Sequence, residues 1–281
     1  MKSATITPVF IYYHTQHPRA ALWAKKIRAW LIKHHIALAA TPDSARTIIV
    51  LGGDGTILEA VKTFQNGNHL FLGLNLGRVG FLASVRNQKD FLPRLRQFFS
   101  GEYTSLARMM LAVSVERKGK TVFLAHALNE AVIQNPLSIS ELAVYIGEHP
   151  AQFIRGSGLL VATATGSTAF NLSAHGPIVM PDIQCLIITE LLDHNVPTPS
   201  AVINAHSHIS VHIKHFRPQG LLANAATAQP LDMVLSLDGG NIFTLKKGDV
   251  VHAHKSAHSA RFAEFEKNYF IKSVQEKFLF R

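Results

Sequence analysis

Short apolar runs alternate with helical periodicity along the first hundred residues of the chain. Residues 7–13, 47–51 and 70–74 are short and rich in β-branched or aromatic side chains, which is typical of buried strands. Between these runs, and after the last of them, side chains recur at helical spacing. These positions are Trp23, Ile27, Trp30, Leu31 and His34, then Ile57, Leu58, Val61 and Phe64, and then Phe91, Leu92, Leu95, Phe98 and Phe99. Because strands that alternate with helices form parallel sheets, the pattern predicts an α/β domain over residues 1–100.

The pattern changes after about residue 100, where short β-like runs are separated by turn residues. These runs are residues 109–115, 121–125, 127–133, 142–146, 159–163, 183–189, 201–203, 209–213, 234–237 and 250–253. They predict a mostly-β domain over residues 101–258. Helical spacing returns at Ile271, Val274, Phe278 and Leu279, so residues 259–281 are expected to form a separate C-terminal segment with a helix.

The composition narrows the class of protein. A chain of 281 residues suits one large domain or two smaller ones, and 47% hydrophobic residues allow a sizeable core. No apolar run approaches the roughly 20 residues of a membrane span, and residues 1–6 lack the apolar segment of a signal peptide. The single cysteine, Cys185, excludes an internal disulfide and a cysteine-based zinc site. We therefore expect a cytoplasmic protein that does not bind membranes.

The net charge of +10 suits anionic partners. Since no run of five Lys or Arg occurs, small anions such as nucleotides are favoured over nucleic acid. The chain also has 16 histidines, with His206 and His208 two residues apart, as are His252 and His254. That spacing places each pair on one face of a strand. A metal site is one interpretation, and partly exposed strand histidines are the favoured one, because no carboxylate or cysteine clusters with them.

The most informative segment is the glycine-rich turn that follows residues 47–51. Its sequence, Gly-Gly-Asp-Gly-Thr at residues 52–56, connects a predicted strand to a predicted helix. Glycine allows close approach to a ligand, and a strand-to-helix turn directs free backbone N–H groups toward phosphate. A carboxylate at Asp54 would repel phosphate unless it acts in the chemistry or binds Mg²⁺. The turn therefore predicts a phosphate site with a built-in acid/base or metal ligand, and an ordinary β-to-α turn is the alternative. The spacing fits neither the P-loop nor the dinucleotide fingerprint.

A second group of polar residues lies in the β-rich half. Asn129 and Glu130 form an adjacent amide and carboxylate that can bind a vicinal diol. Farther along, four hydroxyl side chains surround Gly166, which suits a polar ligand lying against the backbone. They are Thr165, Ser167, Thr168 and Ser173. A Ser/Thr turn that leads into a capped helix is the alternative for this segment.

In this order and spacing, the motifs resemble those of the NAD kinase family. The resemblance rests on Gly-Gly-Asp-Gly-Thr at 52–56, Asn-Leu-Gly-Arg-Val-Gly-Phe-Leu at 75–82, the Asn129–Glu130 pair, and Thr-Gly-Ser-Thr-Ala-Phe at 165–170 followed by Ser-Ala-His-Gly-Pro-Ile. A late Ser-Leu-Asp-Gly at 236–239 also matches. The first motif alone is shared with diacylglycerol and sphingosine kinases, whereas four motifs in register are specific. The resemblance covers roughly residues 5 to 280.

The resemblance implies an N-terminal α/β domain, a mostly-β C-terminal domain, and a last helix that packs back on the first domain. It implies transfer of a phosphoryl group from ATP, or from polyphosphate, to the 2′-hydroxyl of the adenosine ribose of NAD, which gives NADP. Mg²⁺ or another divalent cation is expected to bind through the nucleotide phosphates, and no side chain is assigned as a metal ligand. Family members are homodimers or homotetramers, so a homo-oligomer is expected.

The resemblance also implies roles for individual residues. Asp54 matches the general base, and the residues that match the phosphate loop are Gly52, Gly53, Gly55 and Thr56. Asn129 and Glu130 match residues that bind the ribose hydroxyls. The other positions that match NAD-binding residues are Phe81, Arg155, Ser157, Thr165, Thr168, Ala169, Phe170 and Ser173. Phe81 has an alternative role in core packing.

Several positions depart from the family pattern. The family's usual residue is aspartate where this chain has Ser157, proline at Ala164, tyrosine at Phe170 and glycine at His175. Residues 190–200 replace a Pro-Ile-Cys-Pro-His…Arg-Pro segment, of which only the histidine remains. These departures motivate one alternative, an NAD(H)-binding paralogue with weak or lost kinase activity. A lipid kinase of the same superfamily is the other.

Overall fold

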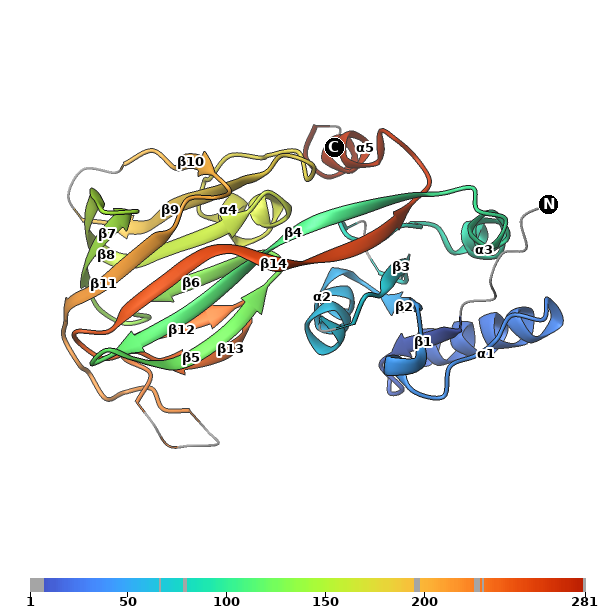
Figure 1. The fold of residues 1–281 in the computed structure, drawn as a ribbon, viewed down its shortest axis with the longest axis horizontal. Helices are drawn as coiled ribbons and strands as arrows, with labels where there is room; N and C mark the ends of the chain where they lie inside the picture. The colour runs from blue at the N-terminus through green and yellow to red at the C-terminus, as the bar shows by residue number, and fades with distance from the viewer. Residues whose placement is uncertain are drawn as a thin grey trace. The chain divides into compact units, whose positions relative to one another are not determined.

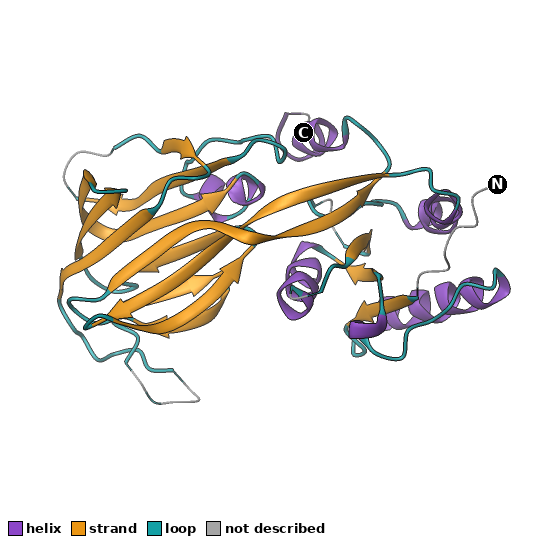
Figure 2. Cartoon of the chain, viewed as in Figure 1, coloured by secondary structure: helices purple, strands orange, loops and turns teal. Residues whose placement is uncertain are grey.

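The computed structural model describes residues 8–65, 67–77, 80–194, 198–224, 228 and 230–279, and the chain divides into two compact units. Unit 1 contains Met1–Arg108 and His258–Arg281, and unit 2 contains Met109–Ala257. The helices are concentrated in unit 1, whereas strands dominate unit 2 (Figures 1 and 2). Within the described part of the chain, no helix is at once long enough and apolar enough to cross a bilayer.

Unit 1 is built on a parallel sheet in the order β1, β2, β3. The strands are β1 (Val9–Tyr13), β2 (Thr47–Gly52) and β3 (Leu70–Asn75), and the end of β14 (Val250–Glu264) pairs in parallel with β3. The helical elements are α1 (Pro18–Lys33), α2 (Asp54–Phe64), α3 (Phe91–Phe99), α5 (Tyr269–Val274), short 3₁₀ turns at Pro42–Ser44 and Gln88–Asp90, and a π-helical turn at Gln275–Leu279. Nearly every residue of β2 and β3 is buried, as expected for a parallel sheet covered on both faces.

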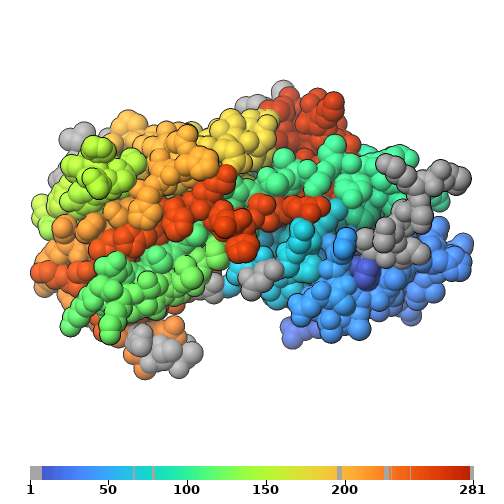
Figure 3. Space-filling view, viewed as in Figure 1, coloured from blue at the N-terminus to red at the C-terminus, as the bar shows by residue number. Residues whose placement is uncertain are grey.

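The core of unit 1 is formed by one apolar face of each helix packed on this sheet. Ile27 of α1, Ile49 of β2, Leu72 of β3 and Phe91 of α3 are fully buried and belong to one cluster with Ala263 of β14. The C-terminal segment therefore supplies part of this core, although it lies about 200 residues from β2 in the sequence. Its outer face forms part of the surface of unit 1, drawn in dark red in Figure 3.

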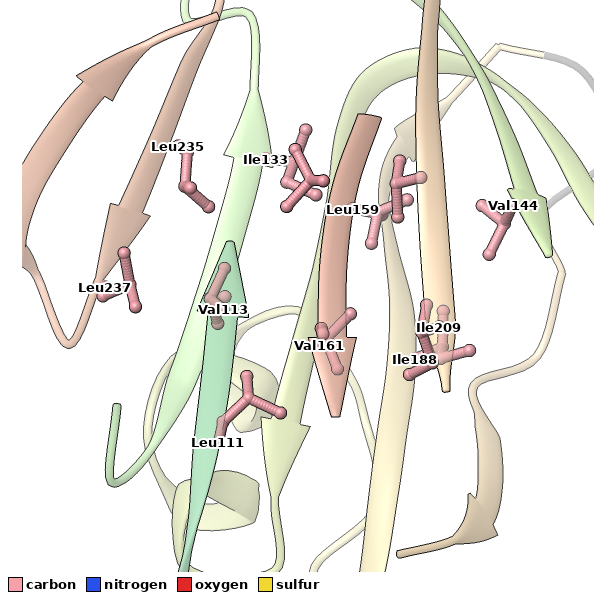
Figure 4. Packing of buried hydrophobic residues seen from close by; sticks show 14 of the residues in the cluster. Leu111, Val113, Ile133, Val144, Leu159, Val161, Ile188, Ile209, Leu235 and Leu237 are labelled. Atoms are coloured by element: carbon pink, nitrogen blue, oxygen red, sulfur yellow. The ribbon is translucent and has the colours of Figure 1, made fainter. Parts of the chain in front are cut away.

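Unit 2 is a set of antiparallel strands around one large apolar core. Its strands are β5 (Lys120–Ala127), β6 (Glu130–Gln134), β7 (Ser140–Ile146), β8 (His149–Thr163), β9 (Cys185–Asp193), β10 (Ala201–Asn204), β11 (Ile209–Phe216), β12 (Val234–Leu237) and β13 (Gly240–Thr244), together with most of β4 (Thr104–Arg117) and β14. The strand order is β14, β11, β7, β8, β6, β12, β13, and β9 also pairs with β8. Apolar side chains such as Val113, Ile133, Leu159 and Ile188 meet in the core (Figure 4).

The short helical elements of unit 2 lie where the sequence predicts a ligand site. Strand β8 ends at Thr163, and a 3₁₀ turn at Thr165–Thr168 and the one-turn helix α4 (Phe170–Ser173) follow. The prediction of an α/β domain followed by a mostly-β domain is confirmed, and the C-terminal segment belongs to the first unit. Residue 7 of the first expected strand and residues 280 and 281 of the expected C-terminal segment lie outside the described residues.

Candidate functional site

The glycine-rich turn lies between β2 and α2 in unit 1. Strand β2 ends at Gly52, Gly53 is the N-cap residue, and Asp54 is the first residue of α2. A Cβ at Gly52 would lie 2.4 Å from Thr56 Oγ1, so the turn requires glycine there. A Cβ at Gly53 or Gly55 would meet no described atom within 4 Å, so the backbone is open at these two positions. This open helix N-terminus fits an anionic group such as a phosphate.

The carboxylate of Asp54 is held by the backbone N–H groups of Phe81 and Leu82. Phe81 N donates to Oδ2 at 2.8 Å, and Leu82 N donates to Oδ1 at 3.2 Å. A Cβ at Gly80 would lie 2.1 Å from Asp54 Oδ1, so glycine permits this close approach. Each carboxylate oxygen retains a further lone pair that can accept a hydroxyl proton. Residues 78 and 79 of the second glycine-rich motif lie outside the described residues.

In unit 2, the Asn129–Glu130 pair is held by Asp238. The Asp238 carboxylate accepts three backbone N–H bonds, from Leu128 at 2.7 Å, from Asn129 at 2.8 Å and from Glu130 at 3.1 Å. Asp238 has a φ of +50° in the turn between β12 and β13. A carboxylate that accepts several N–H groups is a strong local constraint on the backbone. No pattern of residue types predicts this role of Asp238, and its only signal in the sequence is the late Asp-Gly match.

Glu130 is a buried carboxyl group with an unused oxygen. Its side chain is 5% exposed, and in the described part of the chain its Oε2 atom has no hydrogen-bond partner. Burial raises the pKa of Glu130 from 4.5 to about 8, and the negative charge of Asp238 is the second cause of this increase. A backbone hydrogen bond from Phe170 acts in the opposite direction. A buried carboxyl oxygen that lacks a partner fits a hydroxyl group of a ligand.

The hydroxyl-rich segment contains both structural and accessible groups. Ser167 is fully buried, and its Oγ exchanges hydrogen bonds with Val179. Thr168 Oγ1 donates to the carbonyl of Thr165 at 3.4 Å. Gly166 packs closely on Asn129, because a Cβ there would lie 2.2 Å from the Asn129 carbonyl oxygen. The segment that carries the hydroxyl groups therefore lies directly against the Asn129–Glu130 pair.

A pocket of about 840 Å³ opens beside this segment in unit 2. Three residues that the sequence assigns to NAD binding line it, namely Ser157, Phe170 and Ser173. It is also lined by Gln134, Asn135, Pro136, Ala174, His175, Thr189, Glu190, Leu191, Leu192, Asp193, Thr198, Pro199 and Ser200. The volume is in the range of small-molecule and cofactor sites. The positions that depart from the family pattern are concentrated in its wall.

Two of the departures change the chemistry or the backbone of this wall, at residue 175 and on strand β9. His175 has a φ of +62°, a conformation that glycine adopts more easily than histidine. Burial raises the pKa of Glu190, and so does its interaction with Asp193. Glu190 also accepts hydrogen bonds from the Gln152 side chain and from Thr198 N. The pocket therefore has two carboxyl groups, those of Glu190 and Asp193, at positions where the family pattern has prolines.

Two of the residues predicted to bind NAD, Arg155 and Phe81, do not line the pocket of unit 2. The side chain of Arg155 is 56% exposed, and its Nε lies 3.8 Å from Glu141 Oε1, outside the pocket. The ring of Phe81 is 4% exposed and packs against Phe270 and Phe278 in unit 1, which favours the core-packing alternative. The residues of the glycine-rich turn belong to unit 1, and those assigned to ribose and NAD binding, apart from Phe81, belong to unit 2.

The histidines of the two spaced pairs are partly brought together. The ring of His208 lies 5.1 Å from that of His252 and 5.6 Å from that of His254. Burial lowers the pKa of both His252 and His254, and the neighbouring His208 adds to this effect. Over the residues that the structure describes, no group of three or more His, Cys, Asp or Glu side chains is arranged to hold a metal ion.

Solved structures with a similar fold include two kinases of pyridine dinucleotides. Yeast NADH kinase, solved in complex with NADH, has a TM-score of 0.82 and 22% sequence identity, and the match covers 98% of this chain and 88% of that one. An NAD kinase from Archaeoglobus fulgidus, solved in complex with ATP, has a TM-score of 0.72 and 22% identity, with 95% and 98% covered. At this identity, the likeness shows the fold.

Sequence comparison shows the family. Residues 12–103 match the ATP-NAD kinase N-terminal domain, and residues 128–265 match the ATP-NAD kinase C-terminal domain. An NAD kinase from Geobacter metallireducens is 34% identical over 232 residues, which are 82% of this chain and 77% of the relative. An NAD kinase from Citrifermentans bemidjiense is 30% identical over 286 residues, with 93% and 95% covered. The chain therefore belongs to the NAD kinase family.

Proposed function

We propose that this protein is an NAD kinase that transfers a phosphoryl group from ATP, or from polyphosphate, to the 2′-hydroxyl of the adenosine ribose of NAD. The observation that carries the proposal is the Asp54 carboxylate, which is fixed by two backbone N–H groups at the start of α2 in an open glycine turn. Family membership supports the assignment, since the similar proteins from Geobacter and Citrifermentans are named NAD kinases. The product is NADP.

In this proposal, Asp54 accepts the proton of the reacting hydroxyl. Aspartate is a weak base, but the alcohol becomes acidic as its oxygen bonds to phosphorus, so position matters more than basicity. The phosphate loop, at Gly52, Gly53, Gly55 and Thr56, binds the phosphates of the donor, and its backbone is open at Gly53 and Gly55. Mg²⁺ would bind through those phosphates and neutralise their charge.

Asn129 and Glu130 bind the ribose hydroxyls, and the unpartnered Oε2 of Glu130 supports this role. We assign Ser157, Phe170 and Ser173 to the rest of the dinucleotide because they line one pocket. The same ligand is expected to contact Arg155, Thr165, Thr168 and Ala169. We further propose that the protein acts in the cytoplasm as a homodimer or homotetramer.

The test is the formation of NADP from NAD, ATP and Mg²⁺, measured with a coupled NADP-dependent dehydrogenase. Asp54→Asn should lower turnover by about 100- to 10,000-fold, the usual contribution of general base catalysis. NAD binding should persist, since the dinucleotide pocket is unchanged. Asp43→Asn, at an exposed aspartate of the same unit, is the matched control and should keep full turnover.

Absence of turnover in the wild type, with NAD still bound in calorimetry, would refute the kinase and indicate a dinucleotide-binding paralogue. Phosphorylation of a lipid in vesicles without NADP formation would indicate a lipid kinase.

A further inference from the structure

We propose that Arg108 is a positioning residue for the Asp54 carboxylate, and that it acts with Tyr269 of the C-terminal segment by fixing the backbone of residues 80–82. This inference rests on the proposed role of Asp54 as the base. All the groups involved belong to unit 1. Arg108 lies near the N-terminal end of β4, and Tyr269 is the first residue of α5.

The two peptide groups between residues 80 and 82 are each engaged on both sides. The N–H of the first peptide, at Phe81, donates to Asp54, and its carbonyl, at Gly80, accepts from Tyr269 OH at 3.5 Å. The N–H of the second peptide, at Leu82, donates to Asp54, and its carbonyl, at Phe81, accepts from Arg108 Nη2 at 3.3 Å. In a trans peptide the N–H and C=O groups point in opposite directions. The carboxylate therefore lies on one side of this segment, and Arg108 and Tyr269 lie on the other.

This arrangement links Arg108 electrostatically to the base through a peptide group. A cation that donates to a peptide carbonyl polarises that peptide and strengthens the hydrogen bond which its N–H makes. Arg108 therefore strengthens the bond from Leu82 N to Asp54 Oδ1. It does so from a site that is itself desolvated, since its side chain is 2% exposed. Charge interactions are strong in such a site, because little water screens them.

The buried guanidinium is anchored by the C-terminal strand. Its Nη2 atom lies 3.2 Å from Glu264 Oε1, and the guanidinium lies 5.1 Å from the centre of the Phe262 ring. Burial lowers the pKa of Arg108, whereas Glu264 opposes that effect. In the described part of the chain, the Nε atom of Arg108 has no hydrogen-bond partner. A charge buried at this cost with incomplete hydrogen bonding is a poor choice for stability alone.

The C-terminal segment also holds residues 80–82 through the side chain of Phe81. The ring of Phe81 packs against Phe270 at 5.7 Å and Phe278 at 6.1 Å, and Lys277 Nζ lies 4.8 Å from its centre. Tyr269 is in turn held by Arg86, which stacks on its ring at 4.4 Å. The residues that fix the base thus come from both sequence segments of unit 1, Met1–Arg108 and His258–Arg281.

The experiment compares Arg108→Met with Arg94→Met as a matched control. Arg94 also pairs with a glutamate and lies over a phenylalanine ring of the C-terminal segment, at Glu266 and Phe265. Its guanidinium donates hydrogen bonds to Gln97 and Glu266, in place of the Phe81 carbonyl that Arg108 contacts. We expect Arg108→Met to lower kcat by about 10- to 100-fold, because a misplacement of about 1 Å costs on the order of 100-fold. The KM values for NAD and ATP should change by less than about twofold, since the residues assigned to binding are untouched.

A second readout separates positioning from folding. The acid limb of the kcat–pH profile should move to higher pH in Arg108→Met, because a carboxylate with weaker N–H donors binds a proton more readily. Arg94→Met should keep the wild-type profile and kcat. If Arg108→Met folds and retains the wild-type kcat and pH profile, the proposal is wrong.

If Arg108→Met does not fold, Arg108→Lys and Tyr269→Phe take its place in the test. The first keeps the charge but loses the planar guanidinium, and the second removes only the hydroxyl that donates to Gly80. A lower kcat or a displaced acid limb in either variant supports the proposal, whereas wild-type values in both overturn it. A wild-type protein that makes no NADP would instead refute the proposed function, so the two failures are distinct.

Discussion

Replacing Glu130 by glutamine should change how the stability of the protein depends on pH. Burial and the charge of Asp238 raise the pKa of Glu130 from 4.5 to about 8 in the folded chain. Between these pH values the unfolded chain releases a proton that the folded chain keeps. Folding stability therefore falls as pH rises through this window. The loss of stability caused by Glu130 reaches its full size only above about pH 8.

The size of the effect follows from the width of the window. One pKa unit corresponds to about 1.4 kcal/mol, so Glu130 alone should lower the free energy of unfolding by on the order of 5 kcal/mol between pH 4.5 and 8. Glutamine has nearly the same shape and cannot ionise. The stability of Glu130→Gln relative to the wild type should therefore increase by several kcal/mol over this range.

Urea unfolding at several pH values and constant ionic strength measures this difference. Glu148→Gln is the matched control, because Glu148 is an exposed glutamate in the turn between β7 and β8 of the same unit. This control removes one glutamate charge of unit 2 without removing a buried carboxyl group. Parallel stability curves for Glu130→Gln and the wild type would show that Glu130 ionises normally in the folded protein, and the account of the buried carboxyl would be refuted.

Two further predictions concern the strand that carries Ser157. Ser157→Asp, which restores the residue usual in the family, should tighten NAD binding by about tenfold in calorimetry, because a hydrogen bond to a charged group contributes about 1.5–3 kcal/mol. An unchanged affinity would place residue 157 away from the ligand. Gly158→Ala should cost more than about 3 kcal/mol in urea unfolding, since its φ is +153° and a Cβ would lie 2.0 Å from the Ile133 carbonyl oxygen. Gly147→Ala, with φ +62° and open space, should cost only about 1–2 kcal/mol, and equal costs would contradict the steric argument.

The elements and the first motif could be predicted because their signals are local. Strand β2 is apolar along its length since both faces of a parallel sheet are covered, and this produces a visible run that ends at the glycine turn. The start of α2 at Asp54 follows from the same short stretch. Local patterns of this kind need no knowledge of partners distant in the sequence.

The contacts that hold the site together could not be predicted in this way. Asp238 fixes the backbone of Asn129 and Glu130 from 108 and more residues away, and no periodicity relates the two segments. The raised pKa of Glu130 depends on burial and on that distant charge. The sequence leaves the role of Phe81 open between a ligand contact and core packing, and the packing of its ring against Phe270 and Phe278 favours the core. The roles assigned to the site residues stay predictions until the variants are measured.

The departures from the family pattern are concentrated in one place, and their position bears on what they change. Ser157, Phe170, His175, Glu190 and Asp193 all line the pocket of unit 2. Asp54 has two backbone N–H donors in unit 1, and the Asp238 carboxylate accepts three N–H bonds, from Leu128, Asn129 and Glu130. The carboxyl group absent at residue 157 is moreover matched by two carboxyl groups on β9 in the same pocket wall. We therefore expect these changes to alter what the pocket binds, and not the chemistry proposed for Asp54.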